Sequence, residues 1–418
     1  MGIKKLTIEN YKSIQKQDIE LSNVNVFIGE NGCGKSNILE AVAMFAAAKS
    51  NSLTNESLFT RGVRVTKPKL TFNSFTGLTQ RQRVSISVED TDNQKISALL
   101  SCDDKEDIFS TWNDSGTSYV ENVLTPKFQK KISEDFRGLI HQDLAEKLLA
   151  EPGVAKFDED QIKSFVDKYF KNFEPVLNER TRDYVQRDIR SDIFFNYVIY
   201  SLNTNALRGI TNESKKEPLG INGEGLDLLI ASLDEKQLAE LMSYTKFIDW
   251  LQDFDIDADS SLKNGGYKLG RSISNLYFTD RYMQKKNNMF AAENANEGAL
   301  HILGYLALFI SSKTPQFFAI DNIETTLNPK LCRDLMKAIC ELSKKHGKQV
   351  LITTHNPAIL DGLNLHDDDQ RLFVVKRTDE GFTKAERIKI KPQVDGEKLK
   401  LSELWMRGHL GALPSYSF

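Results

Sequence analysis

The segment GENGCGKSN, residues 29–37, has the spacing G-x-x-x-x-G-K-[ST] and lies between an apolar run and a helix-forming stretch. Glycines at these positions let successive backbone N–H groups turn toward the phosphates of a nucleotide, and the N-terminus of the following helix adds its dipole. Lys35 is expected to reach the β and γ phosphates, and the Ser36 hydroxyl to ligate Mg²⁺. The pattern therefore predicts a site for ATP and Mg²⁺. The residues expected to form it are Gly29, Asn31, Gly32, Gly34, Lys35, Ser36 and Asn37.

Two polar residues in the last quarter of the chain each follow an apolar run. Asp321 follows QFFAI, where its carboxylate can hold a water on Mg²⁺, and His355 ends QVLITTH. Taken alone, Asp321 also fits a turn residue and His355 a packed core histidine. Both stand at the carboxyl ends of predicted strands, where α/β folds bind ligands, so we favour a site shared with the phosphate loop. Ser36 and Asp321 are the predicted Mg²⁺ ligands.

The elements that position these residues follow from periodicity. In residues 1–102, KKLTIEN, NVNVFIG and RQRVSISVED favour strands, and SNILEAVAMFAAAKS favours a helix. Residues 265–418 alternate between helices, such as NEGALHILGYLALFISS and PKLCRDLMKAICELSKKHG, and strands, such as QFFAID, KQVLITTH and RLFVVKR. This succession predicts an α/β domain with a mixed, mainly parallel sheet that is covered on both faces.

The middle of the chain is predicted to interrupt that domain. Residues 103–190 are charged and amphipathic with little strand character, which indicates a helical insertion. Residues 191–264 are expected to lead back to the domain, with a strand in DIFFNYVIYSL and helices after GINGEG and in EKQLAELMSYTKFIDWLQDF. The segment SLKNGGYKLG is typical of a hairpin turn.

Composition sets outer limits on the function. A net charge of -3 over 418 residues gives no global attraction to nucleic acid or anionic membranes, although a local basic face leaves nucleic acid open as a partner. The longest apolar stretch, residues 300–310, is too short to span a bilayer, and the first residues lack the apolar core of a signal peptide. The four cysteines show no zinc-like spacing. We therefore expect a cytoplasmic protein without a membrane partner.

Several segments together resemble the ABC-type ATPase heads of the SMC and RecF group. IENYKSI before VFIGENGCGKSNILEAV resembles that group's opening, and TTHNPAIL resembles its switch-histidine segment. NANEGALHIL is similar to the signature loop, which implies a nucleotide-binding role for Asn296, Glu297 and Gly298. LSELWMRGHLGAL resembles the ending of the small stand-alone ATPases of the bacterial PARIS, Septu and overcoming-lysogenization-defect-like phage-defence systems. The resemblance covers residues 1–100 and 265–418, roughly.

The resemblance implies a mechanism and partners. In such heads two protomers sandwich two ATP molecules, so we expect a homodimer, or a higher even-numbered oligomer, that ATP holds together. Phage-defence relatives imply a role as sensor or scaffold beside a separate effector, such as a nuclease. A RecF-like DNA-repair ATPase remains the alternative. A transporter subunit is disfavoured because of the long insertion and the unusual signature loop.

One position departs from the family pattern Asp-Glu-x-Glu. The chain has Asp321, Asn322, Ile323 and Glu324, and an amide can orient a water but cannot accept its proton. Loss of a general base removes about 10²–10⁴-fold of rate, so we predict slow hydrolysis. Asn322, Glu324 and His355 are the catalytic candidates. Glu324 is a candidate displaced base, although two residues further along a turn it is expected to point elsewhere.

Three smaller features were interpreted from sequence alone. Cys33 lies among the phosphate-loop amides, which predicts a lowered thiol pKa, but we favour a small residue in place of serine over a redox sensor at this position. The basic segment TPKFQKKISEDFRG has acidic neighbours and indicates a solvated face more than a nucleic-acid contact. Near-helical spacing of apolar residues around Trp405 predicts a C-terminal helix that packs on its own domain or docks a partner.

Overall fold

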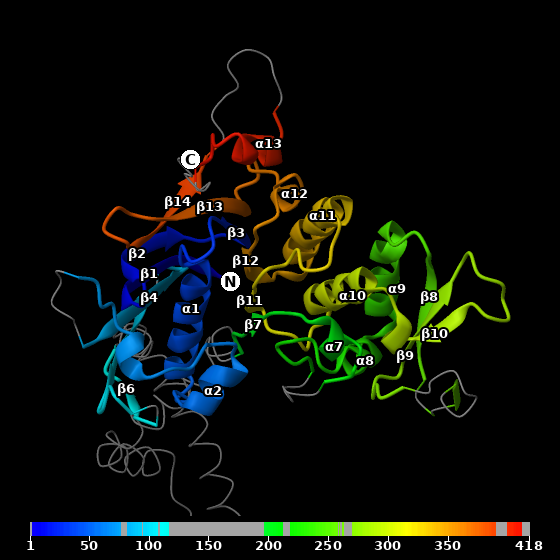
Figure 1. Cartoon of the computed structure of the whole chain (residues 1–418), viewed down its shortest axis with the longest axis horizontal. Helices are drawn as coiled ribbons and strands as arrows, with labels where there is room; N and C mark the ends of the chain where they lie inside the picture. Colours follow the sequence, from blue (N-terminus) through cyan, green and yellow to red (C-terminus); the bar gives the residue numbers. More distant parts are fainter. Residues whose placement is uncertain are drawn as a thin grey trace, which may run out of the picture.

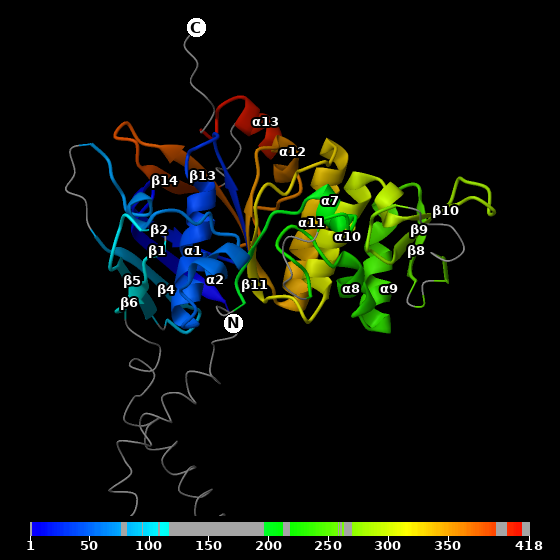
Figure 2. The same ribbon diagram turned by 60° about the horizontal axis from the view of Figure 1, so that its bottom comes forward.

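Three β-sheets organise the part of the chain that the computed structural model describes, which comprises residues 2–76, 82–93, 95–107, 109–116, 196–211, 218–257, 259, 261–262, 270–389 and 399–411. A six-stranded sheet lies at the centre. A five-stranded sheet and a three-stranded sheet lie toward opposite ends of the molecule in both views (Figures 1 and 2).

The central sheet has the strand order β14-β13-β3-β12-β11-β7. Neighbouring strands are parallel from β13 to β7, and β14 pairs with β13 in the antiparallel direction. This arrangement confirms the predicted mixed, mainly parallel α/β fold. The strands are β3 (Val24–Ile28), β7 (Ile199–Tyr200), β11 (Phe317–Ile320), β12 (Gln349–Thr353), β13 (Gln370–Arg377) and β14 (Thr383–Ile388).

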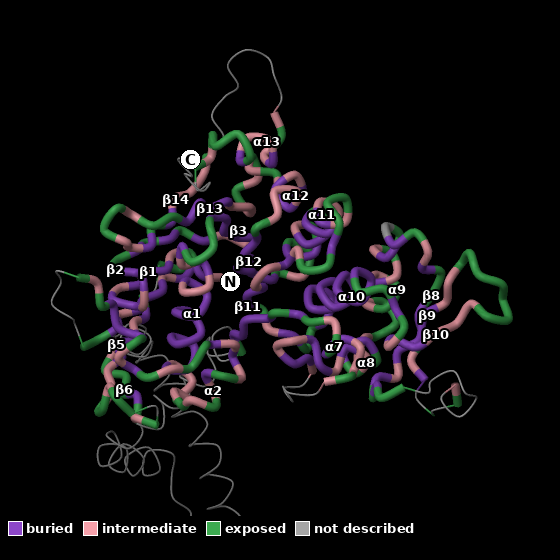
Figure 3. Tube along the Cα trace, viewed as in Figure 1, coloured by how far each residue is buried: buried purple, intermediate pink, exposed green. Residues whose placement is uncertain are grey.

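Both faces of the central sheet are covered, as buried parallel strands require. Successive side chains of β11 enter different cores: Phe317 joins the core that contains α1 (Lys35–Lys49), and Phe318 joins the core of α10 (Glu297–Ile310) and α11 (Pro329–His346). The buried parts of the trace follow these strands and helices in Figure 3.

The five-stranded antiparallel sheet packs with α1 and has the order β2-β1-β4-β5-β6. Sequence reasoning found β1 and β4 but not β2, because only every second or third residue of IQKQDIE is buried. The strands are β1 (Ile3–Tyr11), β2 (Ile14–Glu20), β4 (Val84–Asp90), β5 (Lys95–Cys102) and β6 (Trp112–Asp114).

The first part of the predicted helical insertion is not helical. Cys102 pairs with Trp112 across β5 and β6, so the sheet continues past the expected boundary at residue 102. Short edge strands such as β6 carry too few residues for a periodic signal. The rest of the insertion, residues 117–190, lies outside the described residues, and its predicted helices stay a prediction.

The three-stranded antiparallel sheet has the order β10-β9-β8 and precedes α10 in the chain. The helix predicted over EKQLAELMSYTKFIDWLQDF is α9 (Glu235–Tyr244), and it ends before a 3-10 turn, η2 (Thr245–Phe247). The segment LQDF belongs to a strand instead, because β8 pairs with β9. The segment with the predicted hairpin turn, residues 263–269, lies outside the described residues. The strands are β8 (Leu251–Ile256), β9 (Leu276–Asp280) and β10 (Met289–Ala291).

Several predicted helix ends are confirmed. Pro329 begins α11 after the N-cap Asn328, and Gly347 ends it with φ 63°. The C-terminal helix α13 packs on its own domain, because Trp405 is buried and α13 contacts α12. The remaining helices are α2 (Asn55–Thr60), η1 (Pro68–Leu70), α7 (Thr204–Leu207), α8 (Leu226–Ala231), η4 (Ala292–Asn294), α12 (Pro357–Leu360) and α13 (Leu401–Met406).

In the parts of the chain that the structure describes, no helix combines the length and the apolar character needed to cross a membrane.

Candidate functional site

The phosphate loop connects β3 to α1 and depends on its glycines. Gly32 and Gly34 have φ angles of 77° and 107°, which L-residues rarely adopt. A Cβ atom on Gly34 would lie 2.1 Å from Thr383 Oγ1, so no larger residue fits there. The loop therefore has the backbone that its sequence predicted, and β14 packs closely against it.

Lys35 lies in the first turn of α1 with its side chain folded over this loop. Its Nζ donates hydrogen bonds to the carbonyls of Gly29 and Glu30, each at 2.9 Å. Burial lowers the pKa of Lys35, while Cys33 and the carboxylates of Asp321 and Glu324 oppose that shift. The ammonium group of Lys35 is thus held beside the phosphate loop, where it can reach a bound phosphate.

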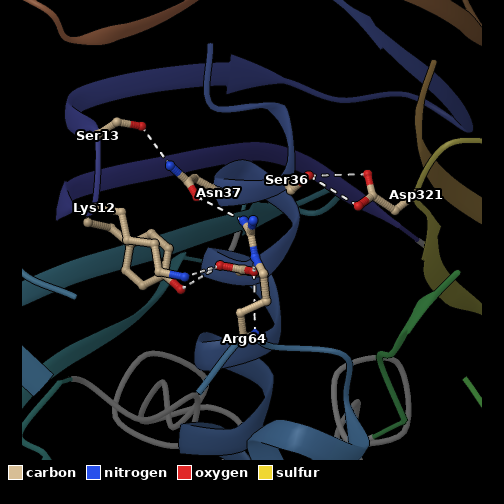
Figure 4. A network of polar contacts seen from close by, with 8 residues as sticks. Lys12, Ser13, Ser36, Asn37, Arg64 and Asp321 are labelled. Carbon is tan, nitrogen blue, oxygen red and sulfur yellow. Dashed lines mark hydrogen bonds and ion pairs between the residues drawn. The ribbon is translucent and has the colours of Figure 1, made fainter. Parts of the chain in front are cut away.

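Ser36 and Asp321 lie together across the phosphate loop, although 285 positions separate them in sequence. Ser36 Oγ donates to Asp321 Oδ2 at 3.1 Å (Figure 4). The Thr353 hydroxyl, at the end of β12, donates to the other carboxylate oxygen. A hydroxyl and a carboxylate are hard oxygen donors, and Mg²⁺ is usually bound by one or two carboxylates together with substrate phosphates. The pair therefore fits Mg²⁺.

Asn322 has a backbone conformation that bears on its identity. Its φ angle is 54°, in the left-handed region that asparagine tolerates better than most residues. Its N–H donates to Thr353 Oγ1 at 2.9 Å, which fixes the turn after β11 to the end of β12. The residue thus has a structural reason to be asparagine in addition to any catalytic one.

Glu324 does not point away from the site, and that expectation was wrong. Its Oε1 accepts a hydrogen bond from the His355 N–H at 2.8 Å, because the turn after β11 curls back toward β12. Its Oε2 is buried and has no hydrogen-bond partner among the described residues. One carboxylate oxygen therefore holds the backbone of His355, and the second is free.

His355 is exposed at the carboxyl edge of the sheet, beyond the end of β12. Partial burial lowers the pKa of its imidazole, and the positive charge of Lys35 lowers it further. The structure thus brings His355 together with the phosphate loop and with Asp321 and Glu324, as the strand-end argument predicted. The lowered pKa favours a neutral imidazole near pH 7.

The loop with signature-like sequence packs beside the turn that follows Glu324, where a Cβ atom on Gly298 would lie 3.6 Å from Leu327 Cδ2. Asn296 caps α10, and its Oδ1 accepts from the Ala299 N–H at 3.3 Å. Asn296 and Glu297 are exposed, and Gly298 is buried. Among the described residues, no hydrogen bond joins Asn296 or Glu297 to the phosphate loop. Asn296 and Glu297 are thus open to solvent at the N-terminus of α10.

A charged cluster beside α1 escaped sequence reasoning. Glu40 is 2% exposed, forms an ion pair with Lys12, and accepts from Arg64 Nε at 2.6 Å (Figure 4). Arg64 Nη2 also reaches Asn37 Oδ1 at 3.4 Å, and Asn37 Nδ2 donates to Ser13 Oγ at 2.7 Å. Two cations around one anion leave a positive excess beside the phosphate loop. The one available signal was a lone glutamate within the apolar stretch ILEAVAMFAAA.

Cys33 is a packed residue of the phosphate loop. Burial raises the pKa of its thiol, and this effect outweighs the opposing charge of Lys35, so the predicted lowering was wrong. The Cys33 carbonyl accepts a hydrogen bond from Thr383 Oγ1 at 2.7 Å. Arg377 Nε donates to the Gly32 carbonyl at 3.0 Å. Side chains of β13 and β14 thus fix the outer side of the loop.

Comparisons with known proteins support the same chemistry. A family model described as an AAA ATPase domain matches residues 1–360. A solved SMC head bound to the C-winged helix domain of ScpA has a TM-score of 0.52, with 94% of this chain and 98% of that chain covered. Its sequence is 13% identical, so this likeness shows the fold, that of an SMC head.

Curated relatives match a short part of the chain. The DNA replication and repair protein RecF of Listeria welshimeri is 43% identical over 60 residues, which is 14% of this chain and 16% of that protein. RecF of Clostridium beijerinckii is 44% identical over 57 residues, 13% of this chain and 16% of that protein. The chain thus spans about a sixth of the length of these relatives.

Proposed function

Because the chain belongs to the AAA ATPase domain family, we propose that it binds ATP and Mg²⁺ at the phosphate loop and hydrolyses the ATP slowly. The observation that carries this proposal is the convergence of Lys35, Ser36 and Asp321, with Ser36 and Asp321 3.1 Å apart. Bound Mg²⁺ supplies charge neutralisation for the β and γ phosphates. Ser36 and Asp321 hold it, and Lys35 contacts the phosphates.

We infer that two protomers associate around ATP. The exposed N-terminus of α10 supports this proposal because, among the described residues, neither Asn296 nor Glu297 forms a hydrogen bond with the phosphate loop of its own chain. Gly298 lets the backbone approach a ligand, and the Asn296 amide can donate to a γ-phosphate of the neighbouring chain. The γ-phosphate is absent from ADP, so association depends on ATP and ends with hydrolysis.

Slow hydrolysis follows from the residues around the proposed water site. Asn322 supplies no base, and Glu324 uses one oxygen for the His355 backbone. In this proposal His355 contacts the nucleotide and reports its state to α12, which begins two residues later. ATP therefore stays bound for longer than in a typical ATPase cycle, and the ATP-bound dimer is the functional state.

Direct nucleotide binding tests the proposal. We expect a fluorescent ATP analogue to bind wild-type protein in the presence of Mg²⁺, and Lys35→Ala and Asp321→Ala to weaken binding at least tenfold. Lys337→Ala, an exposed lysine on α11, serves as the matched control. Equal affinity of the Lys35→Ala variant and wild type would overturn the assignment.

We propose further that the ATP-bound dimer is a sensor or scaffold for a separate effector, such as a nuclease, in bacterial phage defence. The support is the likeness of the segment LSELWMRGHLGAL to defence ATPases. Native co-purification of the wild type and Lys35→Ala tests it. An effector retained only by the wild type supports the role, and the absence of any effector argues against it.

A RecF-like repair function is the second candidate, and the short RecF matches favour it. It predicts ATP turnover that duplex DNA stimulates and DNA binding that weakens steeply with salt. Turnover measured with and without duplex DNA separates the two candidates, because the scaffold role requires no such stimulation.

A further inference from the structure

The turn between β9 and β10, residues 281–288, extends into solvent at the far end of the molecule (Figures 1 and 2). Its sequence, RYMQKKNN, contains three cations and no anion, in a chain whose net charge is -3. Residues 281–287 are all exposed, and the exposed fractions of Tyr282 and Met283 are 75% and 52%. A basic turn thus exposes two large side chains, those of Tyr282 and Met283, to solvent.

Hydrogen bonds hold the turn in a defined conformation and tie it to β8. The Asn287 N–H donates to the Gln284 carbonyl at 2.7 Å, and the Asp280 N–H donates to the Asn288 carbonyl at 2.8 Å. Arg281 Nη2 donates to the Leu251 carbonyl at 2.7 Å, which ties the turn to β8. A cluster of three aromatic rings with centroids 5.6–6.1 Å apart packs at its base: Trp250, Phe278 and Phe290.

Charge is separated within this small sheet. Lys285 and Lys286 form no ion pair with any residue that the structure describes. The exposed acidic side chains of the sheet, Asp253 and Asp255, lie on β8, and β9 separates β8 from β10. Asp280, at the base of the turn, accepts the Tyr282 N–H on its Oδ1, so the turn has one carboxylate at its base and two lysines, Lys285 and Lys286, without an ion pair in its middle.

We propose that the turn formed by residues 281–288 binds single-stranded nucleic acid. Lys285 and Lys286 contact phosphates, and Tyr282 stacks on a base, since aromatic stacking and cationic contacts together are typical of single-strand binding. A duplex offers phosphates but no free base face, so Tyr282 favours a single strand.

The position of the turn links it to the ATP site. β10 leads from the turn through η4 to Asn296, so seven residues, 289–295, separate the turn from the N-cap of α10. A nucleic-acid strand bound at the turn is thus expected to affect the position of the loop proposed to contact the partner's ATP. This link rests on the proposed function, whereas the binding itself does not.

Fluorescence anisotropy with a labelled single-stranded oligonucleotide, as DNA and as RNA, tests the proposal on the full chain. We expect Lys285→Glu with Lys286→Glu to weaken binding at least tenfold and to reduce the slope of log affinity against log salt by about 1.4. Tyr282→Ala weakens binding about tenfold. The matched control, Lys313→Glu with Lys337→Glu, changes the same charge at exposed positions elsewhere and leaves affinity within twofold.

Other outcomes overturn the proposal. They are no binding by the wild type, equal loss in the control variant, preference for duplex over single strands, and turn variants that lose only an acidic protein partner. Thermal unfolding of each variant checks that the fold is intact. Lys35→Ala separates this proposal from the proposed ATPase function, because it abolishes ATP binding and leaves oligonucleotide binding in the absence of nucleotide unchanged.

Discussion

At the scale of single residues, Asn322 joins a catalytic question to a backbone constraint. Its φ of 54° suits asparagine, and a glutamate there adds strain of about 1 kcal/mol. The sequence alone suggested a lost base, because the left-handed turn cannot be seen in the letters DNIE. The lost base and the backbone constraint predict different effects of substituting Asn322.

Asn322→Glu is expected to raise ATP turnover about tenfold or more, because it restores a group that can accept a proton from water. It is also expected to lower the free energy of unfolding by about 1 kcal/mol. Phosphate release and denaturant unfolding measure the two effects. Asn322→Gly keeps the backbone conformation without a side chain and serves as control. Unchanged turnover in both variants would refute the argument from the absent base.

Glu324 is predicted to position His355 through its Oε1. Glu324→Gln keeps an oxygen that accepts a hydrogen bond from the His355 N–H. It is expected to retain turnover within about threefold, because the change in free energy stays within that of one ordinary hydrogen bond. Glu324→Ala leaves that N–H without its partner and is expected to lose about tenfold. Equal, large losses in the two variants would instead identify Glu324 as the general base.

At the scale of elements, Lys348 links α10, which follows the signature-like loop, to β12, which leads to His355. It is 2% exposed, and its Nζ donates to the carbonyls of Leu308 at 2.9 Å and Ser311 at 2.7 Å, at the C-terminal end of α10. Lys348 also directly precedes β12, which leads to His355. A buried ammonium thus satisfies the helix-end carbonyls and joins α10 to β12.

The titration of Lys348 gives a pH prediction. Burial lowers its pKa to about 7, so between pH 7 and the ordinary lysine pKa the unfolded chain binds more protons than the folded chain. Stability therefore rises with pH in this window, by at most about 1.4 kcal/mol per pH unit. Denaturant unfolding of wild type and Lys348→Met from pH 7 to 9.5 measures it. The variant is expected to be less stable and to lose this contribution; parallel curves would contradict it.

Elements were predictable where their pattern is strong and local. Buried strands such as β3 and β12 and the capped helix α11 were found from sequence, because apolar runs, Pro329 and Gly347 mark them directly. β2 and β6 were missed, and LQDF was assigned to a helix, because sheet pairing decided their structure. Such pairings depend on partner strands, here β1, β5 and β9, which the residues of the segment itself do not reveal.

At the scale of the whole molecule, the site combines segments far apart in sequence. The phosphate loop, Asp321 and His355 were predictable because parallel strands bring their carboxyl ends to one edge. Glu40 and its partners Lys12 and Arg64 were not, because nothing in the letters indicates which cations approach a buried carboxylate. The exposed N-terminus of α10 has no hydrogen bond to the phosphate loop among the described residues, and we propose that it contacts the ATP of a partner chain in an ATP-held dimer.

Sedimentation velocity with ATP and Mg²⁺, compared with ADP and Mg²⁺, tests that claim most directly. An ATP-held dimer gives a species of twice the 47.4 kDa monomer mass with ATP, persisting for many minutes, and a monomer with ADP. The Lys35→Ala variant stays monomeric in both, and Asn322→Glu shortens the lifetime of the dimer. A wild-type chain that remains monomeric with saturating ATP, or dimerises equally with ADP, contradicts the account.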